Sequence, residues 1–166
     1  MGTIVPLRPQ QAAELEATKK RVREAFLTFE HREGSKLVDS KEIATVIRSL
    51  GINPSSAQCE LILSEVRNED GTPLITLDRF ETVMTQYLIE KKTELQRDDY
   101  HRLLRAFKAF DPEKKGWIVA DYLKNLMLTK GEVFSPDEVN HMLSVAVDED
   151  TGRIYYEDYA MLLATD

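Results

Sequence analysis

The sequence is poor in the residues that mark several classes of protein. Its single cysteine, Cys59, cannot form an intramolecular disulfide, which excludes a secreted disulfide-stabilised scaffold and favours a reducing, cytosolic compartment. No apolar run approaches the roughly 18 residues that a membrane-spanning helix needs. Seven glycines and six prolines are too few for a collagen-like or low-complexity chain.

Basic residues are also in the minority. The chain of 166 residues carries 22 lysines and arginines against 29 aspartates and glutamates, a net charge of -7. Nucleic-acid binding and docking on anionic membranes both depend on basic patches, so we expect neither kind of partner. What is present, 42% hydrophobic and 31% charged residues, is typical of a globular protein, and the charge favours one that binds other proteins.

The two halves of the chain repeat each other. Residues 22–30 recur as residues 103–111, and both copies carry two phenylalanines three positions apart, followed at once by an acidic residue. In each half the next helix is predicted to stop at a glycine, Gly51 or Gly131, because glycine readily adopts the left-handed conformation that ends helices.

Capping boxes open the following helix in each half, with Ser55 and Gln58 in the first and Ser135 and Glu138 in the second. Apolar residues between these signals recur at helical spacing, and turn-rich loops end in short apolar pairs. We therefore expect eight helices in four helix-loop-helix units, with four very short strands that pair two by two. These strands are predicted at residues 37–38, 74–75, 118–119 and 154–155.

Composition along the chain predicts its division into parts. Residues 1–10, with two prolines, are typical of a flexible tail, and residues 11–90 contain the first two units. Residues 77–110 contain neither glycine nor proline, so the polar stretch 91–97 is predicted to be a linker that is at least partly helical. Residues 98–166 then form the second lobe.

This layout resembles the EF-hand superfamily and calmodulin in particular. The resemblance covers about residues 18–166, and its clearest segments are residues 24–26, 46–54 and 65–66. It implies an all-α, two-lobed calmodulin-like EF-hand fold, with four helix-loop-helix units and short paired strands between the loops.

Three of the four loops differ in length from the calcium-binding pattern. A calcium loop of about twelve residues needs oxygen ligands at positions 1, 3 and 5, glycine at position 6 and a bidentate glutamate at position 12. The first loop is one residue too long, because counting back from Glu42 puts Lys36 in the glycine position. The second is also one too long and ends in Arg79, and the fourth, which begins at Asp148, is one residue short.

The third loop alone is in register. Asp111, Glu113 and Gly116 stand at positions 1, 3 and 6, but Lys115 occupies position 5 and Tyr122 position 12. We expect no cofactor and no metal site, while weak calcium binding in this loop stays open. The double substitution Lys115→Asp with Tyr122→Glu is predicted to create a calcium site there.

A second resemblance is more specific. Loops of these lengths, together with residues 132–135, 144–148 and 154–159, are similar to the calmodulin-like subunits of the nexin-dynein regulatory complex. The resemblance implies a subunit in the axoneme of a cilium or flagellum, in a hetero-oligomeric assembly. Its partners would be other dynein regulatory complex subunits, held through amphipathic or IQ-type helices, and its role the regulation of motility. A weak calcium sensor and a myosin-light-chain-like IQ-helix binder remain the alternatives.

The candidate partner-binding residues lie on the apolar helix stripes. Part of the core of an open lobe becomes a groove that receives an amphipathic helix, and a groove poor in methionine favours one dedicated partner. The predicted residues are Ile47, Leu50, Phe80, Met84, Leu123, Met127, Met142 and Leu162. Trp117 is predicted either to pack in the third loop or to anchor a partner. No nucleophile paired with a base is visible, so we do not expect an enzyme.

Overall fold

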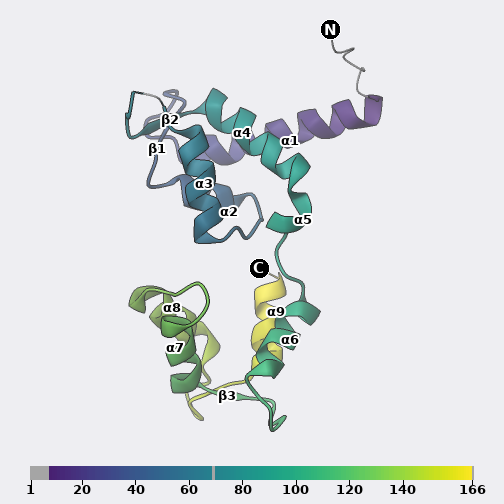
Figure 1. The fold of residues 1–166 in the computed structure, drawn as a ribbon, viewed down its shortest axis with the longest axis vertical. Coiled ribbons are helices and arrows are strands. Elements are labelled where there is room, and N and C mark those ends of the chain that lie inside the picture. Colours follow the sequence, from purple (N-terminus) through teal and green to yellow (C-terminus); the bar gives the residue numbers. More distant parts are fainter. Residues whose placement is uncertain (1–7, 69, 166) are drawn as a thin grey trace. The chain divides into compact units, whose positions relative to one another are not determined.

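The computed structural model describes residues 8–68 and 70–165. It divides into two compact units, Met1–Gln96 and Arg97–Asp166 (Figure 1). The described residues contain nine helices and two pairs of short antiparallel strands, which confirms the predicted all-α architecture with paired strands. The number of helices exceeds the predicted eight because residues Lys92–Leu95 form a further short helix. None of these helices is long and apolar enough to span a membrane.

The N-terminal unit starts with a long helix that begins inside the predicted flexible tail. The elements of this unit are α1 (Pro9–Thr28), β1 (Leu37–Asp39), α2 (Ile43–Ser49), α3 (Ser56–Val66), β2 (Leu74–Thr76), α4 (Leu77–Glu90) and α5 (Lys92–Leu95). The tail prediction was therefore too long at its end, because proline is well tolerated at the first helical position. The first seven residues of that predicted tail lie outside the described residues.

The core of the N-terminal unit lies where α1 and α4 pack side by side (Figure 1). The rings of Phe26 and Phe80 meet there with their centroids 5.1 Å apart, and both side chains are fully buried. β1 and β2 pair with Val38 opposite Ile75, which joins the two loops of the unit. The predicted capping box at the start of α3 is confirmed, since the Gln58 backbone N–H donates to Ser55 Oγ at 3.2 Å.

The segment predicted as a linker folds into the N-terminal unit instead. α5 carries Leu95, which is 1% exposed and packs in the core of this unit. The backbone N–H of Asn53 donates to the Leu95 carbonyl at 3.0 Å, and Ile52 pairs with Gln96 in an isolated antiparallel bridge. The polarity of residues 91–97 suggested a linker, but one buried leucine and these backbone hydrogen bonds fix the segment to the end of α2.

The C-terminal unit repeats the same plan with looser packing. Its elements are α6 (Tyr100–Ala109), β3 (Ile118–Val119), α7 (Ala120–Thr129), α8 (Pro136–Ala146), β4 (Arg153–Ile154) and α9 (Tyr156–Thr165). α6 lies along α9 and α7 along α8, and Figure 1 shows the two pairs joined near the strands. The predicted capping box of α8 is confirmed, because Ser135 and Glu138 exchange two hydrogen bonds.

The fourth strand lies one residue earlier than predicted. Ile118 pairs with Ile154 and Val119 with Arg153, so Tyr155 stands outside the ladder. The short fourth loop explains this shift, since the chain enters α9 at Tyr156, directly after Tyr155.

Candidate functional site

The third loop is organised around a buried carboxylate. Asp111, the residue at position 1, is 5% exposed. Its Oδ1 accepts a hydrogen bond from the backbone N–H of Lys115 at 3.0 Å, and its Oδ2 accepts one from the N–H of Gly116 at 2.8 Å. The Tyr156 hydroxyl, from the start of α9, donates to the same Oδ2 at 2.9 Å. Three donors of this chain therefore hold the carboxylate.

These contacts change the acidity of both partners. Burial by itself raises the pKa of Asp111, but the hydrogen bonds from Lys115, Gly116 and Tyr156 outweigh burial and hold the pKa below its usual value. The pKa of the Tyr156 phenol is raised, first by burial and then by its bond to the Asp111 carboxylate. Asp111 is thus an ionised carboxylate, compensated from within the protein.

The other acidic residue of this loop is also paired. The Lys115 ammonium lies 2.5 Å from a carboxylate oxygen of Glu113. The Trp117 ring is flanked by cations, with the Arg153 guanidinium carbon 3.9 Å and the Lys115 ammonium 5.3 Å from its centroid. Trp117 is half-buried. Its burial and these contacts favour packing within the third loop over the alternative role of anchoring a partner.

In the first loop a glutamate accepts hydrogen bonds from two backbone N–H groups. Glu30 accepts hydrogen bonds from the N–H groups of Gly34 at 3.0 Å and Lys36 at 2.5 Å. The register of the strands shows the extra residue, because Glu30 precedes Val38 by one position more than Asp111 precedes Ile118. Lys36 stands in the glycine position with a φ of 55°. This left-handed conformation is higher in free energy for a residue with a side chain than for glycine.

In the second loop a cationic side chain replaces the last ligand. Arg79, at position 12, donates from Nε to the backbone carbonyl of Glu65 at 3.1 Å. The Asn68 amide donates to the Leu74 carbonyl at 2.8 Å and to Thr72 Oγ1 at 3.1 Å. Nitrogen donors thus stand in this loop where a calcium cage needs oxygen ligands.

The fourth loop closes on itself through one aspartate. Asp148 Oδ1 accepts hydrogen bonds from the Thr151 hydroxyl at 2.7 Å and from its backbone N–H at 2.9 Å. These two bonds lower the pKa of Asp148. Among residues 8–68 and 70–165 no cluster of three or more His, Cys, Asp or Glu side chains could hold a metal ion.

The apolar faces of the two units differ although their sequences correspond. Four core positions can be matched through the repeated phenylalanines, the strand register and the capping serines. In each pair the first residue, from the N-terminal unit, is 0% exposed, and the second, from the C-terminal unit, is only partly buried. The pairs are Phe26 and Phe107, Ile47 and Met127, Ile62 and Met142, and Met84 and Leu163. The C-terminal unit therefore presents apolar surface that its counterpart buries.

The predicted partner-binding residues divide along the same line. Those of the N-terminal unit lie in its core, where at most 7% of each side chain is exposed: Ile47, Leu50, Phe80 and Met84. In the C-terminal unit Leu123 is buried, Met127 and Met142 are partly buried, and Leu162 is 39% exposed. As the N-terminal unit stands, its four residues offer a partner almost no surface, because α1 and α4 close over them.

Two aromatic residues of the site were missed by sequence reasoning. Phe107 was noticed only as part of the repeat, yet its partly buried ring lies 5.7 Å from that of Tyr159. Tyr156 was placed in the fourth loop, and nothing in its sequence context linked it with the third. A loop one residue short was the available signal that the start of α9 would reach a different position.

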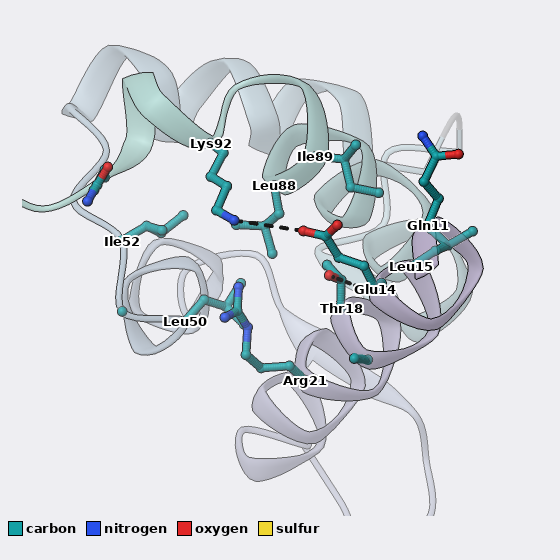
Figure 2. A pocket seen from close by; sticks show the side chains of 13 residues that line it. Gln11, Glu14, Leu15, Thr18, Arg21, Leu50, Ile52, Leu88, Ile89 and Lys92 are labelled. Atoms are coloured by element: carbon teal, nitrogen blue, oxygen red, sulfur yellow. Dashed lines mark hydrogen bonds and ion pairs between the residues drawn. The ribbon is translucent and has the colours of Figure 1, made fainter. Parts of the chain in front are cut away.

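A pocket of about 740 Å³ remains beside the closed face of the N-terminal unit (Figure 2). α1, α4, α5 and the end of α2 supply its walls, with Leu15, Leu50 and Leu88 as apolar lining. Across the pocket, Lys92 and Glu14 form an exposed ion pair at 3.8 Å. α5 thus covers one side of this pocket.

Helix-loop-helix units joined in pairs by short antiparallel strands define a calmodulin-like EF-hand protein, and comparisons with known proteins confirm this class. The Physarum polycephalum myosin II regulatory domain is similar, with a TM-score of 0.63 and 29% identity over 89% of this chain and 94% of that chain. A structure of Mlc1p bound to IQ2 of Myo2p, a class V myosin, has a TM-score of 0.65 and 20% identity over 85% of this chain and 95% of its own, and shows the fold alone.

Sequence relatives give the particular family. The chain is 47% identical over 155 residues to dynein regulatory complex protein 8 of Chlamydomonas reinhardtii, covering 91% of this chain and 93% of that protein. The mouse protein of the same name is 37% identical, over 89% of this chain and 88% of its own length. No family model matches the sequence. The chain belongs to the dynein regulatory complex protein 8 family.

Proposed function

We propose that this protein is a non-enzymatic structural subunit of the dynein regulatory complex in the ciliary or flagellar axoneme. In this role it holds a helical segment of another subunit of that complex, largely independently of calcium, and so contributes to the regulation of motility. The observation that carries the proposal is the partly exposed apolar face of the C-terminal unit, centred on Phe107, Met127 and Met142.

The occupant of this face is best described as an amphipathic helix with basic flanks. Its apolar side would cover the partly buried side chains, as helices do in apolar grooves of other proteins. The net charge of -7 supports attraction of a basic partner over longer distances. The structural neighbour Mlc1p is bound to IQ2 of Myo2p, which is consistent with a helical occupant here.

Independence from calcium is supported by the loops. In each loop donors of this chain hold the main carboxylate or replace a ligand: Gly34 and Lys36 on Glu30, Arg79 in the second loop, Tyr156 on Asp111 and Thr151 on Asp148. A partner that binds an apolar face already present needs no cation to expose it.

The proposal is tested by capture from axonemes with the tagged, full-length chain. A lysine-reactive cross-linker is expected to join a subunit of the dynein regulatory complex to Lys108 of α6 and Lys124 of α7. Recovery should be equal in EDTA and in calcium. Substitution Leu162→Asp should lower recovery about tenfold or more, since it places a charge on an exposed apolar residue of α9 that is predicted to bind the partner.

Leu61→Asp is the matched control. Leu61 is a similarly exposed leucine, at 48% against 39% for Leu162, but it lies on α3 of the N-terminal unit. Far-ultraviolet circular dichroism confirms that both variants fold. Equal recovery with the two variants, or cross-links confined to the N-terminal unit, would contradict the proposal.

A weak calcium sensor is the second candidate function. It is favoured by the length of the third loop and by Gly116, whose φ of 84° gives the turn that a calcium loop needs at position 6. Recovery of the axonemal partner in calcium but not in EDTA would support the sensor, and calcium titration of the purified chain would measure its affinity.

A further inference from the structure

We infer that the hydroxyl of Tyr156 is an internal substitute for a cation, which keeps cations out of the third loop by occupying the position-1 carboxylate of Asp111. Whichever partner the protein binds, this contact bears on which cations the third loop accepts. Tyr156 stands at the start of α9 and contacts the third loop from outside it.

The carboxylate has little capacity left for a metal ion. Its two oxygens offer about four lone-pair sites, and three donors of the chain already point at them. Two are backbone N–H groups of the loop itself, from Lys115 and Gly116. The third, the Tyr156 hydroxyl, comes from outside the loop and is the one that a substitution can remove.

Burial makes this contact difficult to displace. Asp111 is 5% exposed and Tyr156 is 3% exposed, so water competes poorly for their hydrogen bond. The Tyr156 ring also stacks on Phe107 at a centroid distance of 6.3 Å, which fixes the direction of the hydroxyl. A cation that bound Asp111 through Oδ2 would have to break this bond and leave the phenol buried without its partner.

The short fourth loop explains why a tyrosine reaches this place. Ile154 pairs with Ile118 across the strands, and the chain enters α9 two residues later, at Tyr156. The preceding Tyr155 is 38% exposed, in contrast to Tyr156. The neighbouring tyrosines therefore differ in position but not in chemistry, which supplies a control.

The first test uses a chain in which substitutions introduce the two ligand side chains that the third loop lacks. In the full-length chain with Lys115→Asp and Tyr122→Glu, terbium affinity is measured through luminescence sensitised by Trp117. Adding Tyr156→Phe should raise the affinity about tenfold or more, because a hydrogen bond to a charged group no longer competes with the metal. Adding Tyr155→Phe should leave the affinity unchanged. Equal or weaker binding with Tyr156→Phe than with the loop substitutions alone would overturn the inference.

A second measurement needs no engineered loop. In the otherwise unchanged chain, carbon-detected NMR titration follows the Asp111 carboxyl, whose pKa lies below its usual value. Tyr156→Phe should raise this pKa towards the usual value, and Tyr155→Phe should not. If the pKa of Asp111 stays where it is when the Tyr156 hydroxyl is removed, the hydroxyl does not hold the carboxylate and the inference fails.

Discussion

Replacing the matched phenylalanines one at a time tests the difference between the two units. Phe26 is 0% exposed and packs against Phe80, whereas its counterpart Phe107 is only partly buried. Both rings lie near the end of the first helix of their unit, four positions before the acidic residue that follows the second phenylalanine of the repeat. The substitutions Phe26→Ala and Phe107→Ala therefore remove the same atoms from a closed and a more open core.

The expected costs follow from burial. Truncating a buried phenylalanine to alanine lowers the free energy of unfolding by about 3–5 kcal/mol, through lost transfer energy and the cavity left behind. We expect this cost for Phe26→Ala. Part of the Phe107 ring already contacts solvent, so Phe107→Ala should cost about half as much, roughly 1.5–2.5 kcal/mol. A domain of this size is stabilised by only about 5–15 kcal/mol, so both changes are measurable.

The single tryptophan separates the two units in the assay. Trp117 lies in the C-terminal unit, so its fluorescence follows that unit during urea unfolding, while far-ultraviolet circular dichroism follows the whole chain. Phe26→Ala should shift the dichroism transition and leave the Trp117 transition in place, and Phe107→Ala should shift the Trp117 transition. A cost for Phe107→Ala equal to or above that of Phe26→Ala would refute the reasoning from burial.

Two further predictions concern the N-terminal unit. Lys36→Gly should raise the free energy of unfolding by about 1 kcal/mol in urea titrations, since glycine tolerates the φ of 55° at that position; Lys41→Gly, where φ is not positive, should lower it. The pKa of Tyr87 is raised to about 12 by its 2.6 Å hydrogen bond to Glu65 and by burial, so the folded state keeps its proton longer than the unfolded state. Stability from this group should be complete below pH 10 and lost between about pH 10 and 12, and Tyr87→Phe should remove that loss from the pH profile of urea midpoints.

Local signals in the sequence were sufficient for several helix ends. Serine caps followed by glutamine or glutamate placed the starts of α3 and α8, and Gly51, with a φ of 75°, stands just after α2 as predicted. Helix caps and helix stops depend only on residues that are neighbours in the sequence, so they can be predicted from the spacing of residues along the chain. The repeat added the pairing of strands, because two equivalent loops in a unit must lie side by side.

Contacts between distant residues were beyond that reasoning. The polar run 91–97 gave no sign that Leu95 would fold back on the end of α2, because the backbone partner, Asn53, is far away in the sequence. The bond from Tyr156 to Asp111 joins residues that are 45 positions apart, and it depends on the length of the fourth loop. Ligand counting could show that the third loop lacks two ligands, but not that the carboxylate it retains is occupied.

At two of the four matched positions, the difference between the closed and the more open unit coincides with a difference in side-chain shape. Ile47 and Ile62 of the N-terminal unit are β-branched and stiff, so they favour a single, tightly packed arrangement. Their counterparts Met127 and Met142 have unbranched, flexible side chains that repack against surfaces of different shape at small cost. Exchanging stiff for flexible residues at matched positions weakens the preference for one closed core, and it leaves a surface able to adapt to an incoming helix. Comparing the two halves position by position therefore favours the C-terminal unit as the proposed partner-binding unit, whereas the hydrophobic pattern alone did not distinguish the two units.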